Sequence, residues 1–135
     1  MIIYADTIRG LTPDRLEGFF VNWKKTPSPE KHLRLLKKSD YILLAIDDRS
    51  NRVVGFITAI SDTILSAYIP FLEVLPEYQH RGIGSKLVRL MLNRLKEHYM
   101  LDLTCDPGMQ GFYRKFGLIP STGMMRRSYD HQSGK

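Results

Sequence analysis

The chain has 135 residues, 43% of them hydrophobic and 25% charged, a balance that suits one compact domain over 1–135 with a single core. No apolar run approaches the roughly 20 residues that a membrane-spanning helix needs, and the N-terminus lacks the basic-then-apolar layout of a signal peptide. We therefore expect a cytoplasmic protein without a membrane partner. The single cysteine, Cys105, cannot form an internal disulfide, and we expect it to be buried and inert. No second cysteine or close histidine pair completes a metal site.

The net charge of +6 is unevenly distributed along the chain. Residues 1–75 carry ten Lys and Arg against nine Asp and Glu, whereas residues 76–135 carry ten against five. An excess of this kind suits a polyanionic small ligand or a nucleic acid, although a solvated basic surface is the ordinary explanation.

The first half of the chain predicts a strand, two helices and a hairpin. An alternating pattern favours a strand over residues 2–8. Thr12 and Ser28 are each followed by proline, which is typical of a helix N-cap and first turn, so we expect helices over 12–25 and 28–39. Two β-rich runs joined by the polar turn DRSNR then predict an antiparallel hairpin.

The next apolar segment, 64–76, predicts a central strand with two irregular positions. Pro70 has no N–H to give to a neighbouring strand, which favours a bulge or an unpaired stretch. Glu73 places a carboxylate inside an otherwise apolar run. Both features raise the expectation of a functional site, because a buried charge must be paired, neutralised or used.

The second half predicts a crossover unit followed by short elements. Apolar residues at helical spacing favour a helix over 82–99, and the strand MLDLTC after it should run parallel to the strand at 64–76. A short helix is expected over 110–116, ending at Gly117, and one or two strands over 118–130. Residues 131–135 resemble a frayed tail.

The glycine-rich turn "QHRGIGS" before the long helix is the strongest chemical signal. Counted from Gly82, the dinucleotide fingerprint G-x-G-x-x-G requires a third glycine at the position of Leu87. A P-loop requires lysine directly after its second glycine, where this chain has Ser85. Neither motif is therefore present. A phosphate cradle requires neither pattern, because glycines admit an anion close to the backbone and the first N–H groups of a helix are unpaired. Arg81 and Lys86 add positive charge there.

This turn resembles the Q/R-x-x-G-x-G/A signature of the GNAT (Gcn5-related) N-acetyltransferases. The likeness extends to the strand end L-x-V-x-P at Leu72–Pro76 and to the segment GFYRKFGL at 111–118. The expected order of elements is also similar. The resemblance implies an α/β fold of the α+β mixed-sheet kind, in which a mostly antiparallel sheet has parallel, splayed middle strands and flanking helices.

The resemblance also implies a binding mode for acetyl-CoA as cosubstrate. The pyrophosphate would lie on backbone N–H groups of the turn, and the pantetheine arm would run along the strand at Leu72 and Val74. The expected coenzyme-binding residues are Leu72, Val74, Gln79, His80, Arg81, Gly82, Ile83, Gly84 and Ser85.

Acyl transfer requires a neutral amine, a stabilised carbonyl oxygen and a protonated leaving thiolate. By resemblance, Tyr113 protonates the departing sulfur, and a backbone N–H near Val74 stabilises the oxygen. Glu73 is the first choice for the base, although a salt-bridged or surface role is equally open. We expect Asp106 to be the N-cap of the following short helix. Tyr68 is a further candidate for the base, and some members of the family use water relays in place of a side chain.

The sequence therefore predicts an acetyl-CoA-dependent N-acetyltransferase that acts on a small-molecule or peptide amine in a ternary complex. A non-catalytic acyl-CoA-binding or sensing module is the alternative. A nucleic-acid-binding domain is disfavoured because no recognition motif is present. A homodimer is compatible with the resemblance, and no metal cofactor is expected.

Overall fold

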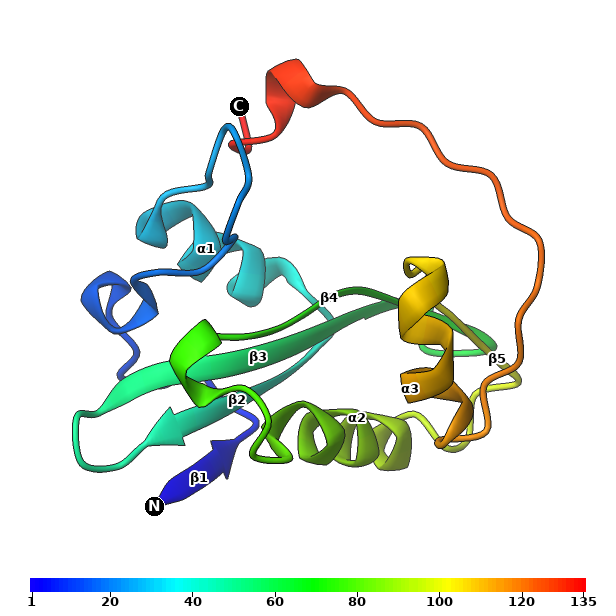
Figure 1. Ribbon diagram of the computed structural model, residues 1–135, viewed down its shortest axis with the longest axis horizontal. Coiled ribbons are helices and arrows are strands. Elements are labelled where there is room, and N and C mark those ends of the chain that lie inside the picture. The colour runs from blue at the N-terminus through cyan, green and yellow to red at the C-terminus, as the bar shows by residue number, and fades with distance from the viewer.

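The protein is built around a five-stranded mixed sheet, as a computed structural model of residues 1–135 shows (Figure 1). The strands are β1 (Ile2–Ala5), β2 (Tyr41–Asp47), β3 (Arg52–Ser61), β4 (Ser66–Val74) and β5 (Met100–Asp102). They lie in the order β1-β2-β3-β4-β5; the first four are antiparallel, and β5 runs parallel to β4. The predicted fold class, a mostly antiparallel mixed sheet with one parallel, splayed pair of strands and flanking helices, is confirmed, although the parallel pair lies at the edge of the sheet and not in its middle.

Helices cover both faces of this sheet. The α-helices are α1 (Pro29–Lys38), α2 (Ile83–Arg94) and α3 (Gln110–Arg114), and the short 3-10 turns are η1 (Pro13–Leu16), η2 (Pro76–Tyr78), η3 (Pro107–Met109) and η4 (Tyr129–His131). Helix α2 packs on one face against β2, β3 and β4, whereas η1 and α1 pack together on the other (Figure 1). No helix is long and apolar enough to cross a bilayer.

Helix α1 and the β2–β3 hairpin form where the sequence predicts them. The hydroxyl of Ser28 accepts the N–H of Lys31 at 3.1 Å, so the predicted N-cap is made. The helix ends at Lys38, one residue before the expected end. A four-residue turn, 48–51, closes the hairpin.

The helix predicted over residues 12–25 is wrong beyond its first turn. Only Pro13–Leu16 is helical, and the chain then turns through Gly18, Phe20 and Asn22, all of which have positive φ. The physical reason is a long-range contact, because the Glu73 carboxylate accepts the N–H groups of Phe20 and Val21. Those donors are therefore directed at the sheet and cannot continue a helix.

Strand β4 carries the predicted irregularity at Pro70. Thr58 pairs with Phe71 and Ile60 pairs with Tyr68. Between these two pairs β4 contains one residue more than β3, which is a β-bulge. On its other edge, β4 pairs with β5 only from Ser66 to Tyr68. The strands separate beyond that point, as the expected splay requires.

The C-terminal region differs from the prediction. Helix α3 ends before Gly117, which has a φ of 88°, as expected of a left-handed cap. The strands expected over 118–130 are absent, because this segment pairs with no strand of its own chain. It forms an extended arch that returns towards α1 (Figure 1). The prediction of a buried Cys105 is also wrong, since β5 ends at Asp102 and the thiol lies in an exposed loop.

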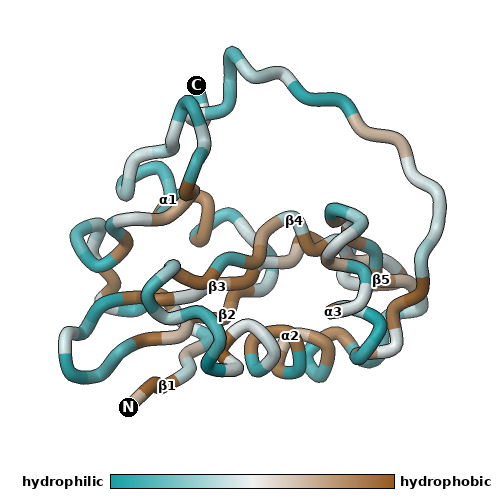
Figure 2. Tube along the Cα trace, in the orientation of Figure 1, coloured by the Kyte–Doolittle hydropathy of each residue, from teal (hydrophilic) through white to brown (hydrophobic).

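The core lies between the helices and the middle strands. The most hydrophobic parts of the chain are β2, β3, the first half of β4 and the inner face of α2 (Figure 2). Phe56 on β3 is completely buried and contacts the rings of Phe19, Phe20 and Phe71 at centroid distances of 5.2, 6.0 and 6.4 Å. This aromatic cluster attaches the irregular segment after η1 to the sheet.

A histidine lies inside this aromatic cluster. The ring of His32, on α1, is 1% exposed and lies 4.4 Å from the ring of Phe56. Neither of its nitrogens has a hydrogen-bond partner. Burial lowers the pKa of His32 from 6.5 to about 4, so the folded protein holds it neutral.

We expect His32 to make the protein sensitive to acid. Below about pH 6.5 His32 takes up a proton in the unfolded chain but stays neutral in the folded one. The free energy of unfolding should therefore fall as the pH is lowered from about 6.5 to about 4, by up to about 3 kcal/mol in total. The variant His32→Leu should lose this slope, because a leucine needs no hydrogen bond. Urea unfolding at several pH values measures the difference.

The exposed His131 supplies the control, since His131→Leu should keep the wild-type slope. Hydrogen bonds lower the pKa of the carboxyl groups of Asp47 and Asp62, first from the Tyr78 hydroxyl and the Ile64 N–H respectively, but these groups act nearer pH 4 and below. An unchanged slope in His32→Leu would show that His32 does not cause the effect.

Candidate active site

The candidate site is centred on the half of β4 that β5 leaves uncovered. Leu75 donates its N–H to the carbonyl of Val54 on β3 at 2.8 Å. Because the backbone N–H groups of a strand alternate in direction, those of Val74 and Leu72 point to the opposite, open edge. An extended ligand could pair there as an additional strand would.

The turn between β4 and α2 presents unpaired N–H groups beside this open edge. Gly82 has a φ of 82° and is the N-cap of α2, and His80 also has a positive φ of 65°. The first N–H of this region to find an acceptor is that of Lys86, which bonds to the carbonyl of Gly82 at 3.0 Å. The unpaired donors belong to His80, Arg81, Gly82, Ile83, Gly84 and Ser85. Six amides at the start of a helix form a site suited to an anion.

Side chains hold this turn in place. The amide of Gln79 donates to the carbonyl of Val74 at 3.0 Å, which links the turn to the end of β4. Arg81 donates to the carbonyl of Glu77 at 3.1 Å, and its guanidinium lies 5.1 Å from the ring centre of Tyr78. Gln79 and Arg81 thus have structural contacts of their own in addition to their place in the turn.

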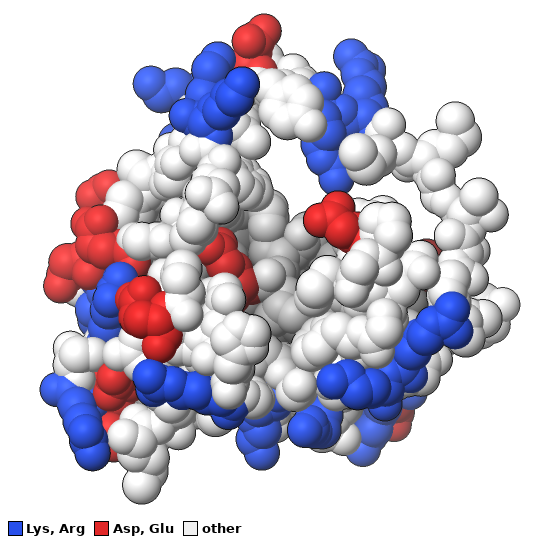
Figure 3. All heavy atoms as spheres, viewed as in Figure 1, with Lys and Arg blue, Asp and Glu red and all other residues white.

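Positive charge gathers around the same helix. Lys86 and Arg89 lie on α2, and Lys115 follows α3 with its ammonium group 5.3 Å from the ring centre of Phe112. Arg94, at the far end of α2, is paired with Asp6 at 3.1 Å. Lys and Arg side chains line most of the lower edge of the molecule, where α2 lies, with some carboxylates among them towards its two ends (Figure 3). The surface near the unpaired amides therefore attracts anions.

Tyr113 lies on α3, on the same side of the sheet as α2. Its ring is partly buried and packs edge-on against Phe112 at 5.0 Å. Its hydroxyl has no hydrogen-bond partner within the chain. Burial raises the pKa of Tyr113, and the nearby Cys105 thiol contributes in the same direction, so the phenol keeps its proton at neutral pH.

Glu73 lies on the opposite face of β4 from Leu72 and Val74. Its two carboxylate oxygens accept the N–H groups of Phe20 at 2.8 Å and Val21 at 3.2 Å. Sequence reasoning foresaw a partnered carboxylate as one option but did not identify this partner. The contact joins β4 to the segment 17–23, so Glu73 has a clear structural role whatever else it does.

Of the two other carboxyl or phenol candidates, Tyr68 has a side-chain partner and Asp106 has only a backbone one. The hydroxyls of Tyr68 and Thr104 lie 3.1 Å apart, bridging β4 to the loop after β5. Asp106 occupies the N-cap position of η3, as expected, and its carbonyl accepts the N–H of Met109 at 2.8 Å. Its side chain makes no capping bond.

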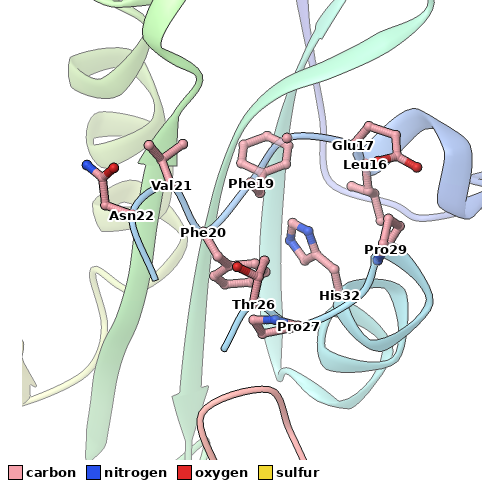
Figure 4. A pocket seen from close by; sticks show the side chains of 11 residues that line it. Leu16, Glu17, Phe19, Phe20, Val21, Asn22, Thr26, Pro27, Pro29 and His32 are labelled. Atoms are coloured by element: carbon pink, nitrogen blue, oxygen red, sulfur yellow. The ribbon is translucent and has the colours of Figure 1, made fainter. Parts of the chain in front are cut away.

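A pocket of about 310 Å³ lies between the segment 17–23 and the start of α1 (Figure 4). Its lining comes mainly from residues 16–22 and 26–32 of the chain, and His32 points into the space between the rings of Phe19 and Phe20 (Figure 4). Sequence patterns do not predict this pocket, because they favour a helix over the residues that line one side of it.

A family model described as the acetyltransferase (GNAT) family matches residues 8–118. Among curated proteins, the uncharacterized N-acetyltransferase ycf52 of Porphyra purpurea is 31% identical over 102 residues, which are 73% of this chain and 59% of that protein. The chain thus spans about three fifths of the length of the curated relatives it matches.

Among solved structures, a candidate acetyltransferase from Deinococcus radiodurans R1 is 40% identical and superposes with a TM-score of 0.96 over 99% of this chain and 93% of its own. A GNAT family acetyltransferase of Streptococcus pneumoniae TIGR4 is 30% identical, with a TM-score of 0.76 over 95% of this chain and 98% of its own. Glucosamine-6-phosphate N-acetyltransferase of Arabidopsis thaliana, at 14% identity and a TM-score of 0.72 over 96% of this chain and 99% of its own, shares the fold.

We expect the variant Gly82→Ala to weaken coenzyme A binding on the order of tenfold. A Cβ at this position meets nothing within 4 Å, but the φ of 82° strains any other residue, and relief of that strain moves the amides of the turn. Calorimetric titration with coenzyme A measures the loss.

Gly10 offers a matched control, because it has a φ of 75° and equally open surroundings. Gly10→Ala should cost a similar free energy of unfolding, about 1 kcal/mol, and leave coenzyme A affinity unchanged. Equal affinities in the two variants would contradict a role for the turn in binding.

Proposed function

Because the chain belongs to the acetyltransferase (GNAT) family, we propose that it transfers the acetyl group of acetyl-CoA to a primary amine by direct attack in a ternary complex. The observation that supports this most is the open edge of β4, which leads directly to six unpaired amides at the start of α2. A thioester with a long polar arm and a pyrophosphate has the shape and charge for that track.

In this proposal the pyrophosphate binds the turn and the pantetheine arm pairs with β4. The N–H groups of His80 to Ser85 receive the phosphate oxygens, and Leu72 and Val74 offer backbone groups to the amides of the arm. The thioester then lies where β4 and β5 separate. Its carbonyl oxygen becomes negative during attack, and a free backbone N–H of the open edge of β4 beside the thioester is the proposed donor to it.

The amine reaches the thioester from the face of β4 that carries Glu73. Attack forms a carbon–nitrogen bond and breaks the carbon–sulfur bond, so one proton must leave the nitrogen and one must reach the sulfur. The acetyl group is transferred without a covalent intermediate on the protein, and the ternary complex supplies proximity and orientation.

Tyr113 is the proposed acid for the leaving thiolate. Its hydroxyl is free of other partners, and burial raises the pKa of Tyr113, which keeps the proton available. The phenol lies on the α2 face, and the amine enters from the other face. Acid and base would therefore act from opposite sides of the strand.

Glu73 is the proposed base, acting on the amine directly or through a water molecule. Each of its oxygens accepts one backbone N–H and retains a second lone pair. The same two bonds also favour a purely structural carboxylate. The alternative function, a module that binds acyl-CoA without turnover, would follow if Glu73 only anchors the segment 17–23 and no other base is present.

The activity itself is tested by thiol release from acetyl-CoA across a panel of amines, including polyamines, amino acids, aminoglycosides and peptides. We expect Tyr113→Phe to lower kcat by about 10²-fold while coenzyme A affinity stays within experimental error. Tyr99→Phe, at a site 83% exposed, is the control and should retain wild-type kcat. An unchanged kcat in Tyr113→Phe would remove this residue from the mechanism.

The variant Glu73→Gln separates the two roles of the carboxylate. If Glu73 is the base, kcat should fall by about 10²-fold without a matching loss of affinity for the amine. Glu73→Asp retains a carboxylate on a shorter arm and should recover part of the lost rate. If Glu73→Asp is as slow as Glu73→Gln and both variants bind the amine more weakly, Glu73 only positions the segment 17–23.

A further inference from the structure

The buried ring of His32 has only apolar rings around it. Its centre lies 5.2 Å from that of Phe19, 4.9 Å from that of Phe20 and 4.4 Å from that of Phe56, and neither of its nitrogens has a hydrogen-bond partner. A buried polar group without a partner loses the hydrogen bonds that it makes with water in the unfolded chain. The closed structure therefore tolerates only the neutral imidazole at this position.

The charged groups on the elements around His32 do not compensate for this burial. Arg52 of β3 donates to Glu77 and to the carbonyl of Glu17, and Glu73 of β4 accepts two N–H groups of the segment 17–23. No ion pair of the chain includes His32, so a protonated ring would be buried without a counter-charge. The other charged residues of η1, the segment and α1 are exposed or half-buried: Asp14, Arg15, Glu17, Glu30, Lys31, Arg34, Lys37 and Lys38.

The segment 17–23 forms the cover over this ring. Its polar attachments to the sheet are the bonds from Phe20 and Val21 to Glu73, at 2.8 and 3.2 Å, and the bond from Arg52 to the Glu17 carbonyl. Phe20 and Asn22 have φ values of 63° and 70°, which are unfavourable for residues other than glycine. Few bonds hold the segment closed, and they act against local backbone strain, as in parts of proteins that open locally.

Space for such an opening lies beside the ring. The pocket of about 310 Å³ is bordered by residues 16–22 and by His32, which is only 1% exposed (Figure 4). Phe19 and Phe20 belong to the segment, whereas Phe56 belongs to β3. Movement of the segment alone can therefore bring water to His32 while Phe56 stays in the sheet.

We propose that His32 and the segment 17–23 form an acid-sensitive switch, in which protonation of His32 releases the segment from Glu73 while the sheet remains folded. In the closed form the ring is neutral and Glu73 accepts the N–H groups of Phe20 and Val21. In the open form the ring is hydrated and can carry its charge, and both bonds to Glu73 are broken. The switch is a property of the fold and does not depend on the proposed acetyl transfer.

The direction of the effect follows from the two environments of His32. Burial lowers the pKa of His32 from 6.5 to about 4 in the closed form, whereas a hydrated ring titrates near 6.5. Protons therefore favour the open form. The ratio of open to closed molecules should be constant above about pH 7 and should rise by about 30-fold between pH 7.5 and pH 5.

Hydrogen exchange at the amides of Phe20 and Val21 measures this opening in the full-length chain. Their protection, relative to an unstructured amide at the same pH, should be lower than that of the β3 amides and should fall about 30-fold from pH 7.5 to pH 5. In His32→Leu the protection of the two amides should not depend on pH over this range. His131→Leu, at an exposed histidine, is the matched control and should behave as the wild type does.

A second measurement tests the same link from the side of Glu73 and needs no change at His32. Glu73→Ala removes both acceptors, so the segment opens more easily. The pKa of His32, followed by NMR titration of its ring, should then rise from about 4 towards 6.5. Glu97→Ala, at an exposed carboxylate after α2, is the control and should leave the pKa of His32 unchanged.

Four results would overturn the proposal. Equal protection of the Phe20, Val21 and β3 amides would mean that the segment opens only when the whole chain unfolds. Lower protection that does not change with pH would mean that the opening leaves His32 buried. The same pH dependence in His32→Leu would assign the acid response to another group. An unchanged pKa of His32 in Glu73→Ala would mean that the segment does not keep water from the ring.

Discussion

The structure depends on one change of partner along β4. This strand is paired on both edges from Ser66 to Tyr68, shifts by a bulge at Pro70, and continues with β3 alone. A paired strand has no backbone group to offer a ligand, whereas an unpaired edge inside a folded sheet offers several in a fixed direction. The separation of β4 from β5 therefore leaves a free backbone edge in a fixed place, and α2 places the amides of its first turn at the end of that edge.

The two faces of β4 carry different groups of the candidate site. Leu72 and Val74 face α2, the basic side chains and Tyr113, while Glu73 faces the aromatic cluster and the segment 17–23. In the proposed mechanism the anionic, extended coenzyme would lie along the first face, and the amine would approach the second, which carries the carboxylate. The strand itself would then separate the two reactants, which would approach the thioester from opposite directions.

Sequence reasoning correctly predicted those structural features of the candidate site and the fold that depend on local chemistry. Pro70, the glycines of the turn and the N-cap at Ser28 act through their own backbone geometry, so their effects could be predicted from the residues alone. The path of residues 17–23 could not, because it is decided by a carboxylate more than fifty residues away. The predictions for Cys105 and for residues 118–130 were wrong for a related reason, because both assumed strands. Whether a segment pairs as a strand depends on the segments beside it, which the local sequence pattern does not show.

The hydrogen bonds between Glu73 and the segment 17–23 bear on how freely the sequence of that segment can change. Both bonds are made by backbone N–H groups, which every residue except proline possesses. The side chains of Val21 and Asn22 can therefore change without loss of the anchor, and such changes leave the open edge of β4 and the amides at the start of α2 untouched. If the proposed function holds, the fold separates the part that binds the common coenzyme from a segment whose side chains can be exchanged to suit a new acceptor.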